Sequence, residues 1–182
     1  MQDEFLRPVI MILNEAIAFL SKSLDVQDSP QTWADLGCGR GLFTRALATR
    51  LGAGSTVFAV DRSNNFEAGD IGQAVNIRLV EADFVSDALP FDRLDGILMA
   101  NALHYVKDKN DFLEKGLAYL GGKGKWIIVE YETARANRWV PHPVNFEQLK
   151  ALFAASGAKN IQKTAERPSV YQGSMYSAVI TL

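Results

Sequence analysis

A short glycine-rich segment carries the strongest chemical signal in the sequence. Asp35-Leu36-Gly37-Cys38-Gly39-Arg40-Gly41 stands between an apolar run and a segment with helical spacing. Glycine tolerates positive φ and leaves out the side chains that would keep a ligand away from the backbone. Free N–H groups at the start of the following helix can face an anionic group such as a carboxylate. The segment therefore predicts a ligand-binding turn, and Cys38 is interpreted as a small residue within it.

The glycine spacing distinguishes two kinds of nucleotide ligand. A dinucleotide fingerprint has glycine at its first, third and sixth positions, whereas here the sixth position is Leu42 and the last glycine is Gly41. Asp35 also precedes the first glycine by two residues, and its charge would repel a pyrophosphate. A carboxylate at this place suits a ligand that carries an amine and a sulfonium.

Two more acidic residues end the next strand-like runs. Asp61 follows the second run and is suited to accept both ribose hydroxyls of an adenosine. Asp83 follows the third and is suited to accept from an adenine amino group, with Phe84 packing near the ring. Taken alone, an Asp after a strand is usually a turn or cap residue. The combination at successive strand ends indicates a nucleoside site.

The candidates for proton transfer follow the fourth and fifth strand-like runs. His104 is the best candidate for a general base, although a histidine that starts a helix or packs in the core is the alternative. Glu130 and Tyr131 end the fifth run and are further candidates to face an acceptor, or simply strand-end residues. No metal is expected at this site.

A basic and aromatic loop precedes the last predicted helix. Its side chains are suited to hold an anionic acceptor, and a solvated loop is an equal alternative. The residues are Arg135, Arg138, Trp139 and His142.

Alternating strand and helix patterns position these residues. The sequence predicts strands at Thr32–Leu36, Thr56–Val60, Ile77–Glu81, Leu94–Ala100, Lys125–Glu130, Asn160–Glu166 and Met175–Leu182. It predicts helices at Asp3–Leu24, Leu42–Leu51, Asp111–Leu120 (closed by Gly121-Gly122) and Asn145–Ala155. Helical crossovers favour an α/β, doubly wound, mostly parallel seven-stranded sheet with helices on both faces. The last two strands lack a long helix between them, which favours an antiparallel C-terminal hairpin.

Length and composition indicate one globular domain. The 182 residues comprise an N-terminal helical cap segment, 1–30, and the α/β domain, 31–182. A net charge of −2 disfavours nucleic acid as a partner. One cysteine, an acidic first tetrapeptide and the absence of a long apolar run lead us to expect a cytoplasmic protein without a membrane span. The oligomeric state stays open.

These motifs resemble a class I S-adenosylmethionine-dependent methyltransferase, a Rossmann-like family, over roughly Thr32 to Gly157. The strongest match is Trp33 to Gly41. The resemblance implies that the methionine half of the cofactor lies against Asp35, Gly37 and Gly39. It places the ribose on Asp61 and the adenine near Arg62, Asp83 and Phe84. Leu94 to Val106, which includes Asn101, resembles the strand and loop beneath the methyl group.

Two segments depart from the family pattern. The segment 64–76 is short and contains two glycines, so we expect the helix that the family usually has there to be reduced to a turn. Asn101-Ala102-Leu103-His104 replaces an Asn/Asp-Pro-Pro-aromatic motif, which argues against methylation of base or glutamine amides.

The expected function is methyl transfer to an unidentified acceptor, with a small molecule favoured because no insertion supplies a substrate domain. S-adenosylhomocysteine would be the product. Two alternatives stay open: a nicotinamide-dependent oxidoreductase, and a non-catalytic S-adenosylmethionine-binding protein. RNA as the acceptor is a weaker variant.

Overall fold

The computed structural model describes residues 11–63, 65–67, 74–169 and 173–182. The strands are β1 (Thr32–Leu36), β2 (Thr56–Asp61), β3 (Asn76–Glu81), β4 (Leu94–Ala100), β5 (Leu120–Tyr131), β6 (Asn160–Pro168) and β7 (Ser174–Thr181). The helices are α1 (Leu13–Leu20), α2 (Leu42–Ala48), α3 (Lys109–Tyr119) and α4 (Phe146–Ala155), with a short 3₁₀ turn, η1 (Leu103–Tyr105).

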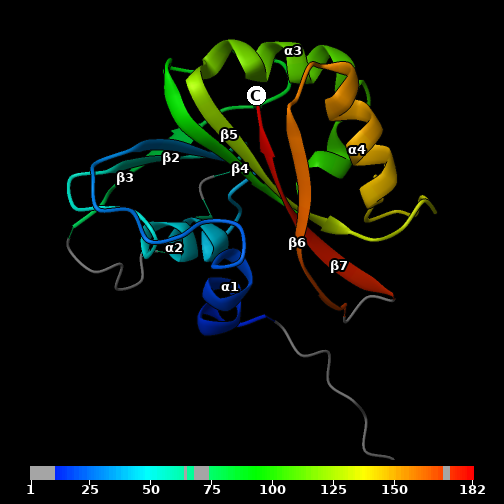
Figure 1. The fold of residues 1–182 in the computed structure, drawn as a ribbon, viewed down its shortest axis with the longest axis horizontal. Coiled ribbons are helices and arrows are strands. Elements are labelled where there is room, and N and C mark those ends of the chain that lie inside the picture. Colours follow the sequence, from blue (N-terminus) through cyan, green and yellow to red (C-terminus); the bar gives the residue numbers. More distant parts are fainter. Residues whose placement is uncertain (1–10, 64, 68–73, 170–172) are drawn as a thin grey trace, which may run out of the picture.

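The strands form one seven-stranded sheet in the order β3-β2-β1-β4-β5-β7-β6 (Figure 1). The pairs among β1 to β5 are parallel, whereas β7 runs antiparallel to both β5 and β6. This confirms the predicted mostly parallel sheet and its C-terminal hairpin. The chain moves outward from β1 through β2 to β3 and then returns to β4 on the other side of β1. That reversal opens a crevice beyond the carboxyl ends of β1 and β4, where ligands bind in such folds.

Two apolar layers cover the sheet, one on each face. Figure 1 shows α1 and α2 on one side and α3 and α4 on the other. Successive strand residues point to opposite faces, so Trp33 packs with the α1–α2 layer while Ala34 packs with the α3–α4 layer. Trp126 packs with the α3–α4 layer, and Ile127 packs with the α1–α2 layer. Burial on both faces explains why these strands read as nearly continuous apolar runs.

Within the described residues, the first helix covers less of the chain than predicted at both ends. Of the predicted span Asp3–Leu24, residues 3–10 lie outside the described part, and helix α1 begins only at Leu13. The Glu15 carboxylate accepts from the Ile12 N–H at 3.0 Å, which fixes the start because a first-turn N–H needs an outside partner. At the other end, the Ser23 hydroxyl lies 2.6 Å from Thr164 Oγ1 and 2.7 Å from Ser177 Oγ. These contacts draw the chain out of the helix and onto β6 and β7.

The junction between α3 and β5 also differs from the prediction. Gly121 and Gly122 do not lie in a turn that closes the helix, because β5 begins at Leu120, immediately after α3. Leu120 has extended dihedral angles and pairs with Leu94 of β4. Pairing with β4 therefore overrides the glycines as a stop signal. The predicted turn between the second and third strands falls mostly on undescribed residues, 64 and 68–73.

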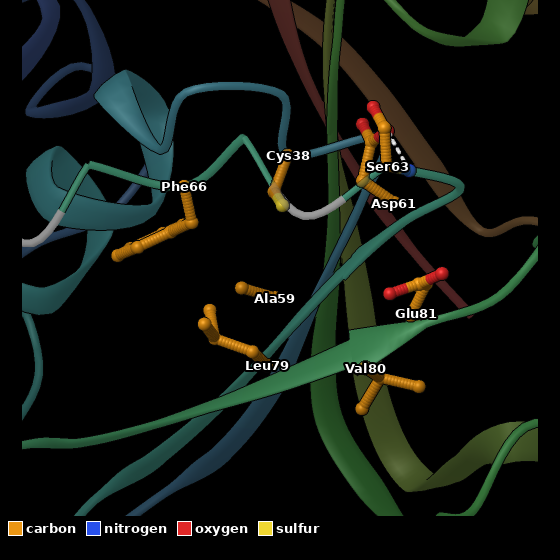
Figure 2. A pocket seen from close by; sticks show the side chains of 8 residues that line it. All are labelled: Cys38, Ala59, Asp61, Ser63, Phe66, Leu79, Val80 and Glu81. Atoms are coloured by element: carbon orange, nitrogen blue, oxygen red, sulfur yellow. Dashed lines mark hydrogen bonds between the residues drawn. The ribbon is translucent and has the colours of Figure 1, made fainter.

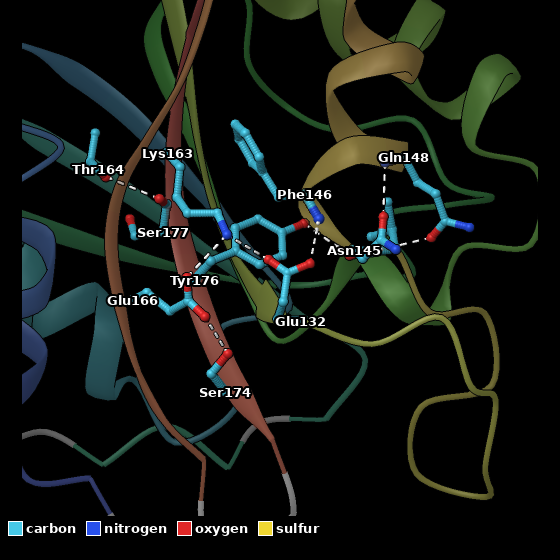
Figure 3. Close-up of polar contacts among 11 residues, drawn as sticks. Glu132, Asn145, Phe146, Gln148, Lys163, Thr164, Glu166, Ser174, Tyr176 and Ser177 are labelled. Atoms are coloured by element: carbon cyan, nitrogen blue, oxygen red, sulfur yellow. Dashed lines mark hydrogen bonds and ion pairs between the residues drawn. The ribbon is translucent and has the colours of Figure 1, made fainter.

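A polar cluster fastens α4 to the C-terminal hairpin (Figure 3). Glu132 accepts from the Phe146 N–H at 3.1 Å and from Lys163 Nζ at 2.7 Å. Lys163 also binds Glu166 at 3.1 Å and lies 5.1 Å from the centre of the Phe146 ring. Tyr176, which is buried, donates to the Val144 carbonyl at 2.9 Å. The cluster holds the segment after β5 in place, and the larger cavity described below is built on that segment.

No helix among the described residues is both long and apolar enough to cross a membrane.

Gly116 of α3 provides a test of the packing. A Cβ atom there would lie 2.5 Å from the buried Trp126 ring. In an open helix, glycine to alanine stabilises by about 1 kcal/mol, but here the clash with the indole reverses the sign. We expect Gly116→Ala to lower the free energy of unfolding by about 1–3 kcal/mol in urea titrations. Gly122→Ala, whose Cβ would meet nothing within 4 Å, is the control and should change little. A Gly116→Ala protein more stable than the parent would contradict this packing.

Candidate active site

The glycine turn after β1 is held by its neighbour β2. The N–H groups of Gly37 and Cys38 donate to the Val60 carbonyl at 2.8 and 3.0 Å. The Gly39 N–H donates to Asp61 Oδ2 at 2.9 Å. Asp61 is therefore a structural support of the turn as well as a candidate ligand.

Each of the three glycines has a positive φ, between 51° and 81°, but the space around them differs. A Cβ on Gly37 would lie 2.6 Å from Ala102 Cβ, and one on Gly41 would lie 2.3 Å from the Phe66 ring. A Cβ on Gly39 would meet nothing within 4 Å. Gly37 and Gly41 thus permit close packing, whereas Gly39 presents bare backbone to open space.

Asp35 is a buried carboxylate near the end of β1, two residues before the first glycine of this turn. Its side chain is 1% exposed, and Oδ2 accepts from Thr44 Oγ1 at 2.6 Å. Oδ1 is buried and has no hydrogen-bond partner. Burial raises the pKa of Asp35 to about 7, the charge of Asp61 raises it as well, and the Thr44 hydrogen bond lowers it in part. A buried, half-satisfied carboxylate is costly unless a donor or a cation completes it.

A small cavity of about 90 Å³ joins Asp61 to the end of β3. Figure 2 shows Cys38 and Phe66 on one side of it, with Asp61, Ser63 and Glu81 at the strand ends. Asp61 Oδ1 accepts from the N–H and the hydroxyl of Ser63 at 3.1 and 3.2 Å. Burial raises the pKa of the Cys38 thiol to about 12, so this cysteine is not an activated nucleophile.

The remaining predicted adenine residues lie beside this cavity and do not line it. Arg62, which is exposed, and Asp83, which is half-buried, form an ion pair 3.8 Å apart. Asp83 Oδ1 also accepts from the Val85 N–H at 2.9 Å, which is an ordinary turn contact. Phe84 is half-buried, and a Cβ atom on Gly37 would lie 3.3 Å from its ring.

Asn101 follows β4 with a left-handed backbone, φ 54°, which few residues other than glycine and asparagine adopt readily. Its N–H donates to the Val129 carbonyl at 2.8 Å. Its Oδ1 is buried without a partner, as is Oδ1 of Asp35. Both atoms belong to strand-end residues at the crevice, and each is an acceptor that lacks a donor.

A second and larger cavity, of about 520 Å³, opens beyond β4 and β5. Its size lies within the range of small-molecule sites. Aromatic rings and small polar groups predominate in its lining, which consists of Asn101, His104, Tyr105, Tyr131, Thr133, Arg135, Ala136, Asn137, Trp139 and Val140.

His104 and Glu130 form a buried pair at the base of this larger cavity. Their side chains are 2% and 1% exposed, and His104 Nδ1 lies 2.8 Å from Glu130 Oε2. Glu130 Oε1 accepts from the His104 backbone N–H at 3.0 Å. Oε2 also accepts from the Tyr131 N–H at 3.3 Å. Glu130 therefore lies behind His104 and does not line the cavity, whereas His104 and Tyr131 do.

The structure thus sorts the sequence candidates into two neighbouring groups. Cys38 and Asp61 line the small cavity, while Asn101, His104 and Tyr131 line the large one. Of the loop residues, Arg135 and Trp139 line the large cavity, whereas Arg138 and His142 do not.

Sequence reasoning missed several contributors. No sequence motif identifies Thr44. It lies in the first helical turn after the glycines and donates a hydrogen bond to one oxygen of Asp35. Ser63, Phe66 and Tyr105 also line the cavities, and their sequence gives no signal beyond proximity to named residues.

Comparison with known proteins agrees with this arrangement. Residues 34–124 match a family model described as a methyltransferase domain. Over 127 residues the chain is 27% identical to a probable tocopherol O-methyltransferase, chloroplastic, from Oryza sativa subsp. japonica. That match covers 68% of this chain and 35% of the relative, so the chain spans about a third of the length of this curated relative.

Solved structures share the fold at lower identity. An S-adenosylmethionine-dependent methyltransferase from Archaeoglobus fulgidus is 15% identical, with a TM-score of 0.67 and coverage of 93% of this chain and 94% of the other. The 1,6-didemethyltoxoflavin-N1-methyltransferase of Burkholderia thailandensis, solved with 1,6-didemethyltoxoflavin and S-adenosylhomocysteine, is 22% identical, with a TM-score of 0.63 and coverage of 93% and 76%. Together with the match over residues 34–124, the glycine turn and the sheet order identify the chain as a member of the methyltransferase domain family, the class I S-adenosylmethionine-dependent methyltransferases.

Proposed function

We propose that this chain binds S-adenosylmethionine in the crevice above Gly39 and transfers its methyl group to a small molecule in the larger cavity. One observation carries the proposal: a buried carboxylate with an unpartnered oxygen, Asp35, immediately precedes a backbone turn that faces open space at Gly39. That pairing favours a ligand with a cationic amine close to a polar backbone. It disfavours a pyrophosphate, which would meet two negative charges, Asp35 and Asp61.

The residues present fit this cofactor. Asp35 would accept from its ammonium group, and Asp61 would accept from the ribose hydroxyls beside the cavity that Cys38 lines. Arg62, Asp83 and Phe84 would border the adenine. When bound, the cofactor supplies an activated methyl group on a sulfonium, so the protein mainly has to orient the acceptor and exclude water.

A small-molecule acceptor is favoured by the size of the larger cavity, about 520 Å³. Two relatives are also named for small molecules, tocopherol and 1,6-didemethyltoxoflavin. The net charge of −2 gives no general attraction to nucleic acid. A cytoplasmic location and the division of the chain at residue 30 are further proposals from the sequence.

Calorimetric titration with S-adenosylmethionine and S-adenosylhomocysteine tests the cofactor. We expect both to bind and NADH not to bind. Incubation of the enzyme with methyl-labelled cofactor and a metabolite extract, followed by mass spectrometry, should reveal a labelled small molecule. Binding without any labelled product would favour the non-catalytic alternative, and binding of NADH alone would favour the oxidoreductase.

Asp61→Ala tests the ribose contact. Removal of a charged hydrogen-bond partner should weaken S-adenosylhomocysteine binding by about 1.5–3 kcal/mol in calorimetry. The control is Asp95→Ala, which removes a carboxylate that accepts from the Thr32 N–H at the opposite end of the sheet. If both variants bind as tightly as the parent, Asp61 is not a ligand of the cofactor.

Asp35 should make cofactor binding depend on pH. Because the pKa of Asp35 lies at about 7 in the free protein, the carboxylate must lose its proton to hold an ammonium group. Affinity for S-adenosylhomocysteine should therefore rise by about tenfold from pH 6 to pH 8, with proton release on binding. Calorimetry in two buffers of different ionisation enthalpy measures both effects.

Asp35→Asn is the matched control for that experiment. The variant should bind weakly at each pH and lose the proton release. Since the pKa is raised in the folded protein, ionised Asp35 destabilises the fold as pH rises from about 4 towards 7. Asp35→Asn should accordingly be more stable than the parent to unfolding at pH 8. Tight, pH-independent binding by the parent would contradict the role of Asp35.

A further inference from the structure

We propose that His104 is the general base of the methyl transfer and that Glu130 is its positioning residue. We further propose that the acceptor is a flat, hydroxylated ring that carries an anionic group. The inference rests on the proposed function, because it names the acceptor chemistry of the same site.

Glu130 fixes the direction of the His104 imidazole ring. Glu130 is 1% exposed and has hydrogen bonds on both carboxylate oxygens, one from His104 Nδ1 and one from the His104 backbone N–H. A carboxylate can only accept, so Nδ1 carries a proton. The lone pair of the neutral ring is therefore on Nε2, the nitrogen left for the cavity that His104 lines.

The His104 backbone and ring are both held by neighbouring residues. His104 lies in η1, and its carbonyl accepts from the His142 N–H at 3.0 Å. The ring centres of Tyr105 and Tyr131 lie 4.3 and 5.9 Å from the imidazole. Backbone and ring are thus fixed together, as the positioning of a general base requires.

The wall of the larger cavity combines aromatic rings with one positive charge. Tyr105, Tyr131 and Trp139 bring three aromatic rings to the lining, and Tyr105 and Trp139 are 52% and 71% exposed. Flat rings stack favourably on such side chains. Arg135 is the one fully charged side chain among the described lining residues, which include no carboxylate. A planar acceptor with an anionic substituent therefore suits both the wall and its charge.

The proton then has a defined path. As the acceptor oxygen bonds to the methyl carbon, its hydroxyl proton passes to Nε2 of His104. The electron pair of the broken carbon–sulfur bond stays with sulfur. The products are a methyl ether, S-adenosylhomocysteine and an imidazolium that faces the Glu130 carboxylate and later returns its proton to water.

Other ionisable groups surround the pair and enter the interpretation of any pH profile. They are Tyr105 on η1, Tyr131 on β5, Tyr176 on β7, Arg135 in the following loop, and Lys109 on α3, whose Nζ donates to the Val106 and His142 carbonyls. Burial lowers the pKa of Lys109, whereas the charge of Glu130 opposes that effect.

A first test needs no acceptor. The chain contains two histidines, His104 and His142, so ¹⁵N NMR of histidine-labelled protein can be assigned with a His142→Asn variant. We expect neutral His104 to be protonated on Nδ1 and bare on Nε2. A ring protonated on Nε2, or one that stays doubly protonated at pH 8, would overturn the base assignment.

A second test uses two matched probes, 4-hydroxybenzoate and 4-hydroxy-3-nitrobenzoate. Both present a ring, a hydroxyl and a carboxylate, but the nitrated hydroxyl is largely ionised at pH 8 and needs no base. His104→Asn should lower kcat on 4-hydroxybenzoate by about 10²–10⁴-fold and on the nitrated probe by far less. Glu130→Gln should show a smaller loss with the same dependence on the probe, mainly in kcat and not in KM.

The outcomes separate this inference from the proposed function. Calorimetry with S-adenosylhomocysteine should give equal affinities for the parent, His104→Asn and Glu130→Gln. If the parent fails to bind it, the proposed function fails. If all three bind but the variants lose activity equally on both probes, or lose none, the base assignment fails. If the parent binds the cofactor and methylates neither probe, the acceptor class is wrong.

Discussion

The structure depends on one electrostatic constraint, a carboxylate buried at the end of the first strand. Asp35 is nearly inaccessible, and the single hydroxyl of Thr44 satisfies only one of its oxygens. Burial without a second hydrogen-bond partner raises the pKa of Asp35. A fold optimised for stability alone would place an apolar side chain there. Asp61 holds the glycine turn that follows Asp35, and this turn faces open space at Gly39. The unsatisfied carboxylate therefore belongs to the crevice of the sheet.

The second buried acid is arranged in the opposite way. Glu130 uses both oxygens within the protein, on the side chain and backbone of His104. A satisfied buried carboxylate fixes the geometry of its partner, whereas an unsatisfied one favours a cationic or donating ligand. Three buried polar side-chain atoms lack partners within the described residues: Asp35 Oδ1, Asn101 Oδ1 and Trp126 Nε1. The first two belong to the crevice, and nothing in the structure explains the third.

The larger cavity owes its shape to the C-terminal part of the chain. The segment after β5 supplies six of its lining residues, Thr133, Arg135, Ala136, Asn137, Trp139 and Val140. Glu132 holds the start of that segment by binding Phe146 and Lys163. The hairpin of β6 and β7 therefore contributes to the cavity indirectly, although none of its described residues lines it. The smaller cavity depends instead on the glycine turn, β2 and β3, all within the residues 34–124 that match the family model. The larger cavity takes only Asn101, His104 and Tyr105 from those residues.

The sequence alone determined the sheet, the order of its elements and most of the crevice. Local patterns carried this information: apolar runs of strand length, glycines at fixed spacing, the Asn145–Gln148 capping pair, and acidic residues at strand ends. Parallel strands connected by helices bring their carboxyl ends to one edge, so the sequence predicts that Asp35, Asp61 and Asn101 lie near each other.

Only the tertiary structure decided which residues touch, because those contacts join segments far apart in the chain. Thr44 donates to one oxygen of Asp35, Glu130 lies behind His104, and Tyr105 lies against the imidazole, and none of these contacts has a local signature. The same reason explains the differences at element ends. Leu120 pairs with Leu94, and Ser23 contacts Thr164, so distant partners outweighed the glycine and helix signals in the adjacent sequence.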